Sequence, residues 1–176
     1  GGTPYKVFTP YWKAMKAAYR APEALPAPKS LSGPDIETVT VDDLGLHPTN
    51  PDWSGGLAEA WSPGEAGAIE RLSDFLEGPI NTYADDRNRP DLEGGTSRLS
   101  PHLHFGEISP AQVWRAVQHG ISADKFDETN AMVFLSELVW REFSYVLLYY
   151  NPDLATENYN SDFDALPWRK DSDAAR

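Results

Sequence analysis

Hydrophobic residues are densest between residues 128 and 150, where they occupy nearly every side of a helical pattern. This run is far longer than a strand, and Asn151-Pro152 supplies a stop signal directly after it, so we expect one long helix over 128–150. A helix that is apolar all round is typical of a buried element. Its apolar members are Met132, Val133, Phe134, Leu135, Leu138, Val139, Trp140, Phe143, Val146, Leu147 and Leu148.

Two shorter segments also show helical spacing between clear start and stop signals. Ser62-Pro63 can begin a helix, with Glu65 at the third position of a capping box, and Gly78-Pro79 ends it. Ser109-Pro110 repeats this start signal for a helix through about His119, and Gly120 ends it. The apolar face of the first helix consists of Leu72, Phe75 and Leu76.

The first 60 residues have a different pattern. Residues 5–8 suggest a short extended piece, and Pro10 begins a helix that we expect to reach Tyr19. From Arg20 to Trp61 the chain is rich in Pro, Gly, Asp and Thr, and only 37–41 alternates as a strand would. So long an irregular stretch is typical of a linker or a functional wrap. The pattern as a whole predicts a mainly α protein with long irregular connections.

Composition and charge exclude several classes of site and function. The chain has no cysteine, which excludes disulfides, thiolate metal sites and a cysteine nucleophile. The net charge of −12 argues against a general nucleic-acid binder, because phosphate contacts require Lys and Arg. However, residues 31–70 contain eight acids and no Lys or Arg, so the rest of the chain is nearly balanced. A local basic site near Arg87, Arg89 and Arg98 therefore remains open, beside the alternative of an acidic linker and ordinary surface arginines.

Two charged residues interrupt the long apolar helix. Glu137 and Arg141 are four residues apart and so share a face. Burying both is costly unless they pair and find further hydrogen bonds. Two interpretations stay open: an internal salt bridge, or a polar ligand cavity with Trp140 and Phe134 as flat stacking surfaces.

A second candidate site lies between Tyr83 and Ser100. Gly94-Gly95 frees the backbone, and hydroxyl side chains and Arg98 follow directly. Hydroxyls and free backbone N–H groups at a helix start suit a phosphate, although the same residues are also typical of a simple turn and cap. His102, His104 and Glu107 invite a metal-site interpretation. His-x-His spacing suits a strand, whereas this segment has a helical pattern, so we expect no metal.

Three ordered motifs resemble the DNA photolyase/cryptochrome family. Residues 95–110 (GTSRLSPHLHFGEISP) are similar to that family's flavin-phosphate segment, and 134–143 (FLSELVWREF) to its active-site helix. Trp61 to Glu65 and the Arg71-Leu-x-x-Phe-Leu motif resemble the start of the same helical domain. Thr3 to Trp12 resembles the end of the family's antenna domain.

The resemblance implies a domain organisation. Residues 1–19 would be the tail of an antenna α/β domain, 20–60 the interdomain linker, and 61–176 the first half of an all-helical FAD- and DNA-binding domain. The other wall of the flavin pocket and the rest of the antenna domain would belong to the remainder of the polypeptide. The complete protein is expected to be a cytoplasmic monomer with no membrane span, with a folate or deazaflavin antenna chromophore on the N-terminal domain.

The resemblance also assigns roles to individual residues. Glu137 and Trp140 would be catalytic, with Glu137 hydrogen-bonded to a flipped-out pyrimidine pair, and Trp168 would be the outermost tryptophan of an electron-transfer chain. DNA would contact Arg87, Glu137, Trp140, Arg141 and Ser144. The flavin would contact Tyr83, Thr96, Ser97, Arg98, Leu99, Ser100, Phe134, Glu137 and Arg141.

The implied activity is light-driven repair of cyclobutane pyrimidine dimers in UV-damaged DNA, by electron transfer from reduced FAD. The cofactor would carry the hard chemistry, while the protein orients it and excludes water. A damaged base pair costs less to flip than an intact one. Two alternatives remain: a cryptochrome-type flavin photosensor without repair activity, and a helical scaffold without a cofactor in which Glu137 and Arg141 form only a core ion pair.

Overall fold

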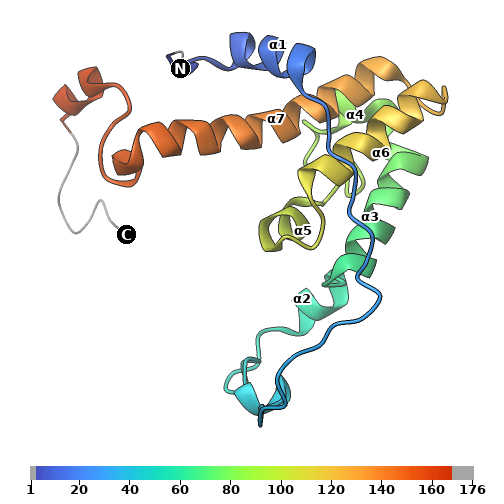
Figure 1. Cartoon of the computed structure of the whole chain (residues 1–176). Coiled ribbons are helices and arrows are strands. Elements are labelled where there is room, and N and C mark those ends of the chain that lie inside the picture. Colours follow the sequence, from blue (N-terminus) through green and yellow to red (C-terminus); the bar gives the residue numbers. More distant parts are fainter. Residues whose placement is uncertain (1–2, 168–176) are drawn as a thin grey trace. The chain divides into compact units, whose positions relative to one another are not determined.

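The computed structural model describes residues 3–167, and these residues form helices joined by turns and irregular segments, without a β-strand. The mainly α prediction is therefore confirmed for the described part of the chain (Figure 1). The helices in chain order are α1 (Phe8–Ala18), η1 (Asp42–Leu44), α2 (Gly55–Ala60), α3 (Glu65–Glu77), η2 (Pro79–Thr82), α4 (Tyr83–Asp86), α5 (Ser100–Phe105), α6 (Pro110–Ser122), α7 (Glu128–Tyr150), η3 (Pro152–Ala155) and η4 (Ser161–Ala165).

The chain divides into two compact units. The N-terminal unit joins Gly1–Tyr19 to Ser136–Arg176, and the central unit is Arg20–Leu135. Helix α7 contributes residues 128–135 to the central unit and residues 136–150 to the N-terminal unit. Each unit is described by itself below.

The central unit has its core between α3, α6 and the first turns of α7. Helices α3 and α6 contact one another, as Figure 1 shows. The segment after Arg20 also reaches α6, because Arg115 Nη1 donates a hydrogen bond of 3.2 Å to the carbonyl of Pro22. The buried apolar side chains of this unit are Ala68, Leu72, Phe75, Ile80, Tyr83, Leu99, Leu103, Ile108, Val113, Trp114, Val117, Ala131, Phe134 and Leu135.

The N-terminal unit is built on a contact between α1 and α7. The ring of Phe8 stacks on Trp140 with centroids 3.7 Å apart and planes at 9°, and Tyr11 packs against Phe143 at 5.2 Å. Phe143 is 3% exposed, so this aromatic cluster supplies a small core. No helix in the described residues is both long enough and apolar enough to cross a membrane.

Helix boundaries show where the sequence prediction needed correction. Helix α3 begins at Glu65 with Gly64 at the N-cap, so Ser62 does not form the expected capping box. Gly120 lies inside α6, which continues to Ser122. Residues 37–41 form no strand. By contrast, Ser109 caps α6 in a reciprocal capping box with Gln112.

The predicted burial of the long helix is also wrong in its second half. The bounds of α7 are those predicted, and Leu135, Leu138, Val139 and Phe143 are buried. Beyond Phe143 the large side chains lie at the surface of the described chain: Tyr145, Leu148, Tyr149 and Tyr150 are all exposed. Apolar character alone therefore did not identify which turns of this helix have neighbours.

Candidate functional site

Tyr83 lies in an aromatic cluster at the centre of the central unit. Its ring meets Phe75 and Phe134 edge-on, with centroids 5.6 and 5.3 Å away, and Phe75 and Phe134 are 4.6 Å apart. All three side chains are at least 93% buried. Edge-to-face packing of this kind adds to area burial and fixes the ring orientations. Two of the residues that the sequence assigned to flavin contact, Tyr83 and Phe134, are thus neighbours.

Hydrogen bonds join the turn that carries Tyr83 to the start of α7. The backbone N–H of Ala84 donates to Asn130 Oδ1 at 2.8 Å, and the N–H of Asp127 donates to Asn81 Oδ1 at 3.0 Å. Asp127 in turn accepts from both the backbone and the side chain of Asn130. The hydrogen bonds to Asp127 lower the pKa of its carboxyl group, and the one from the Asn130 backbone N–H has the largest effect. The sequence analysis gave no signal for this connection, because its members are far apart in the chain.

The predicted phosphate segment borders a hollow of about 350 Å³ in the same unit. Thr96, Ser97 and Arg98 line it on one side, and Arg71 and Phe75 come from α3. Two guanidinium groups and two hydroxyls form a donor set that suits a phosphate. Asp74 and Glu93 also line the hollow, together with Pro79 and Gly94. Arg71 was not among the predicted site residues, although it belonged to a quoted family motif.

Arg98 has an unusual backbone conformation in this segment. Its φ of 53° lies in the left-handed region, which a residue with a side chain seldom adopts. The guanidinium carbon lies 4.7 Å from the centre of the Trp61 ring, a distance at which the positive charge is attracted to the face of the ring. Trp61, from the motif at residues 61–65, and Arg98, from the motif at residues 95–110, are therefore in direct contact.

Helix α5 begins where the phosphate segment ends. Leu99, its N-cap, is 1% exposed, and its backbone N–H donates to Ser97 Oγ over 3.4 Å. Ser100, the first residue of α5, is exposed. Gly95 is required by close packing, since a Cβ there would lie 2.7 Å from the carbonyl oxygen of Asp86. The segment thus presents its hydroxyl groups on a backbone that is anchored by Leu99 and Gly95.

His102, within α5, pairs with the half-buried Glu107, which follows the helix. His102 is 3% exposed, and its Nδ1 lies 2.5 Å from Glu107 Oε2. The contact from His102 and a hydrogen bond from the backbone of Gly64 hold the pKa of Glu107 below its usual value. The pair therefore ties α5 to the start of α3. Within residues 3–167 no group of three or more His or acidic side chains has the geometry of a metal site.

The remaining predicted residues of α7 belong to the N-terminal unit. Trp140 is 43% exposed, with Phe8 against one face of its ring. Ser144 Oγ donates to the carbonyl of Trp140 at 2.9 Å. Glu137 is half-buried and accepts a long hydrogen bond of 3.5 Å from Ser136. A half-buried carboxyl group thus lies one turn before a large, partly accessible aromatic ring.

Arg141 is held by neighbours on α7. It forms an ion pair with Glu142 over 2.5 Å, and its guanidinium lies 4.9 Å from the centre of the Tyr145 ring. Arg87 follows α4 in the central unit, where its backbone N–H donates to Tyr83 and its side chain is half-buried. Trp168, the predicted electron-transfer residue, lies outside the described residues.

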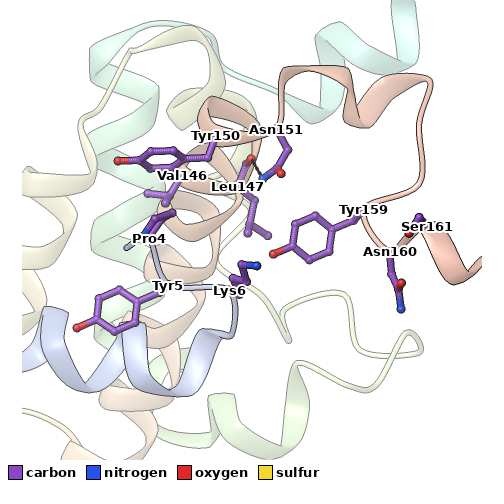
Figure 2. A pocket seen from close by; sticks show the side chains of 10 residues that line it. All are labelled: Pro4, Tyr5, Lys6, Val146, Leu147, Tyr150, Asn151, Tyr159, Asn160 and Ser161. Carbon is purple, nitrogen blue, oxygen red and sulfur yellow. Dashed lines mark hydrogen bonds between the residues drawn. The ribbon is translucent and has the colours of Figure 1, made fainter. Parts of the chain in front are cut away.

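A second hollow, of about 520 Å³, opens between the N-terminal segment and the end of α7 in the same unit. Figure 2 shows Lys6 and Tyr159 facing each other across it, with Tyr150 and Val146 above. Among the described residues that line it, Lys6 is the one ionisable side chain other than tyrosine, and none is a carboxylate. The sequence analysis assigned no role to these residues.

Comparisons with known proteins place these features in a family. Residues 134–176 match the FAD binding domain of DNA photolyase. A deoxyribodipyrimidine photo-lyase of Agrobacterium fabrum is 41% identical over 172 residues, which cover 97% of this chain and 35% of that protein. Cryptochrome-1 of Arabidopsis thaliana is 30% identical over 178 residues, 97% of this chain and 26% of that protein.

The fold agrees with the sequence matches. The crystal structure of a bacterial class III photolyase from Agrobacterium tumefaciens superposes with a TM-score of 0.87 at 40% identity, and the match covers 99% of this chain and 36% of that one. The fold is therefore that of part of a photolyase, and it matches part of the helical FAD-binding domain. The chain belongs to the DNA photolyase/cryptochrome family and spans about a third of the length of the photolyases that it matches.

Proposed function

We propose that this chain carries part of the flavin- and DNA-binding machinery of an enzyme that repairs cyclobutane pyrimidine dimers in light. The observation that carries the proposal is the agreement of fold and sequence with a photolyase over 99% of the chain. The predicted site residues lie in helices, in the turn after α4 and in the irregular segment before α5, except Trp168, which is outside the described range. The antenna chromophore, the monomeric state and the cytoplasmic location stay part of this proposal for the complete protein.

The hollow beside Thr96 and Ser97 fits the phosphate part of a dinucleotide cofactor such as FAD. Its hydroxyl and guanidinium groups are hydrogen-bond donors, and Gly94, which has open space beside it, leaves the backbone accessible to a close approach. Arg98, Leu99 and Ser100 would complete this binding segment. Tyr83, Phe134, Glu137 and Arg141 would contact other parts of the cofactor. Bound reduced FAD would supply the light-driven electron for dimer splitting.

The residues proposed to act on the lesion are on α7. Trp140 offers a partly exposed ring on which an extruded pyrimidine can stack. Glu137, one turn earlier, can hydrogen-bond to the pyrimidine edge and so favour charge that develops there. Arg141 and Ser144 lie on the following turn, and Arg87 would contact the DNA backbone from the other unit.

A binding assay tests this proposal. The measurements are the visible absorption of the chain after incubation with FAD and removal of the unbound FAD, and the affinity of the chain for oligonucleotides with and without a dimer. We expect a flavin spectrum and a preference for the dimer. Glu137→Gln should reduce the preference roughly 10- to 150-fold, since one hydrogen bond to a charged group is worth about 1.5–3 kcal/mol.

Glu128→Gln is the matched control, because Glu128 is an exposed acid in the first turn of the same helix. It should leave the preference unchanged. Equal preference in the Glu137→Gln variant and the unmodified chain would contradict the proposed role of Glu137 and favour the scaffold alternative. A photosensor without repair activity has weaker support, because the plant cryptochrome is 30% identical and the Agrobacterium photolyase 41%.

A further inference from the structure

A third hollow lies in the central unit, where α2 and the segment after it meet α5. Its volume is about 520 Å³, and none of the described residues that line it was assigned to flavin, DNA or electron transfer. A mainly apolar hollow of this size with a few polar groups is typical of a small-molecule site. Its apolar lining residues are Leu57, Ala58, Trp61, Pro63, Pro101 and Phe105.

The aromatic part of this lining is fixed by its neighbours. The Trp61 ring is half-buried, and the Arg98 guanidinium carbon lies 4.7 Å from its centre. The ring of His102 meets Trp61 edge-on, with centroids 6.4 Å apart. Side chains held in this way lose little conformational freedom when a ligand binds, so less of the binding free energy is spent on ordering them.

His102 adds one buried polar group to the hollow. Its side chain is 3% exposed, and Nδ1 lies 2.5 Å from Glu107 Oε2. An ionised carboxylate only accepts, so Nδ1 carries the proton, and the neutral ring presents Nε2 as an acceptor. Among the described residues His102 forms no other hydrogen bond, and every fully buried side-chain N or O atom there has a partner. Nε2 therefore stays accessible from the hollow that His102 lines.

The other polar residues of the hollow narrow the class of ligand. Ser54 Oγ donates to Asp52 at 2.7 Å, and the Glu107 carboxylate accepts from His102 and from the backbone of Gly64. His47 is exposed. No Lys or Arg is among the described lining residues, so nothing here favours a phosphate or another strong anion. The lining instead suits a flat apolar molecule with a single hydrogen-bond donor.

We propose that this hollow binds a small aromatic molecule with one donor group, of the phenol or indole class. Its ring lies against Trp61 and Phe105, and its O–H or N–H donates to Nε2 of His102. The inference goes beyond the proposed function and does not depend on it, because the two share no binding residue. The alternative occupant is a side chain from the remainder of the polypeptide, since the chain spans about a third of the photolyases that it matches.

The test uses 4-methylphenol and toluene as probes, because they differ only by the hydroxyl group. Their affinities for the chain are measured by ligand-detected NMR at about pH 8.5, above the ordinary histidine pKa of about 6.5. We expect 4-methylphenol to bind roughly 2- to 13-fold more tightly than toluene, which is the effect of one neutral hydrogen bond. His102→Phe keeps a ring and removes the acceptor, so it should abolish this difference while toluene still binds.

A second variant keeps the test decisive if His102→Phe does not fold. Leu57 is 53% exposed, so Leu57→Ala removes part of the lining without opening the core. It should weaken both probes about fivefold, for a loss of about 40 Å² of apolar contact. Leu44→Ala is the matched control, because Leu44 is 55% exposed in η1 and does not line the hollow. It should leave both affinities unchanged.

Three results would overturn the proposal. They are the absence of binding of either probe, equal affinity of the unmodified chain for both probes, and equal effects of Leu57→Ala and Leu44→Ala. The same titration on a chain completed with the remainder of the Agrobacterium fabrum photolyase tests the alternative occupant. Retained binding supports a small-molecule site, whereas loss of binding would show that the polypeptide itself fills the hollow and would also overturn the proposal.

Discussion

At the scale of single residues, His102 and Glu107 form a structural hydrogen bond, although their types and spacing first suggested a metal site. Their spacing suggested a metal site, which the sequence analysis set aside on the basis of helical periodicity. In the structure they form a short, largely buried hydrogen bond, and Glu107 also accepts from the backbone of Gly64. The pair could not be predicted, because it depends on how α5 turns back toward α3.

This pair leads to a prediction about pH. The pKa of Glu107 is lowered, chiefly by His102, so the carboxylate stabilises the fold above its ordinary value of 4.5. The stabilisation by the Glu107 carboxylate is lost as the pH falls from about 4.5 through the lowered pKa of this group. Thermal unfolding followed by circular dichroism should show that Glu107→Gln reduces the loss of stability on acidification. Parallel pH profiles for the variant and the unmodified chain would contradict the assigned role.

At the scale of elements, helix ends next to a proline were predicted more accurately than the end at Gly120, which lies inside α6, and interior contacts were not predicted. Asn151-Pro152 correctly marked the end of α7, and Ser109 correctly marked the start of α6. The stacking of Phe8 on Trp140 had no local signal, since it joins residues from opposite ends of the chain. The same holds for the bond between Asn130 and Ala84, which positions the turn of Tyr83.

The start of α3 gives a prediction at this scale. A Cβ on Gly67 would overlap the carbonyl oxygen of Ser62, which cannot move without the backbone. Gly67→Ala should therefore destabilise the chain by roughly 1–3 kcal/mol, as overpacking does. Gly56→Ala in α2 is the control: nothing lies within 4 Å, so the substitution should stabilise the helix by roughly 0.5–1 kcal/mol. Urea unfolding measures both, and a stabilised Gly67→Ala variant would show that the packing is loose.

At the scale of the whole molecule, the resemblance of three motifs predicted the fold family and the helical class. The resemblance also assigned Tyr83, Phe134 and Thr96 to flavin contact, which stays a prediction, whereas the packing of Tyr83 against Phe134 and the hollow beside Thr96 were not predicted.

The most direct test of the photolyase assignment is light-dependent repair by a chimera. In it, this chain replaces the 172 residues that it matches in the Agrobacterium fabrum photolyase. Flavin content and thermal unfolding establish that the chimera is folded and loaded. The account predicts that a dimer-containing oligonucleotide is repaired under blue light and not in the dark, and that Glu137→Gln slows repair per flavin-loaded molecule. A folded, flavin-loaded chimera that leaves the dimer intact under light would contradict it.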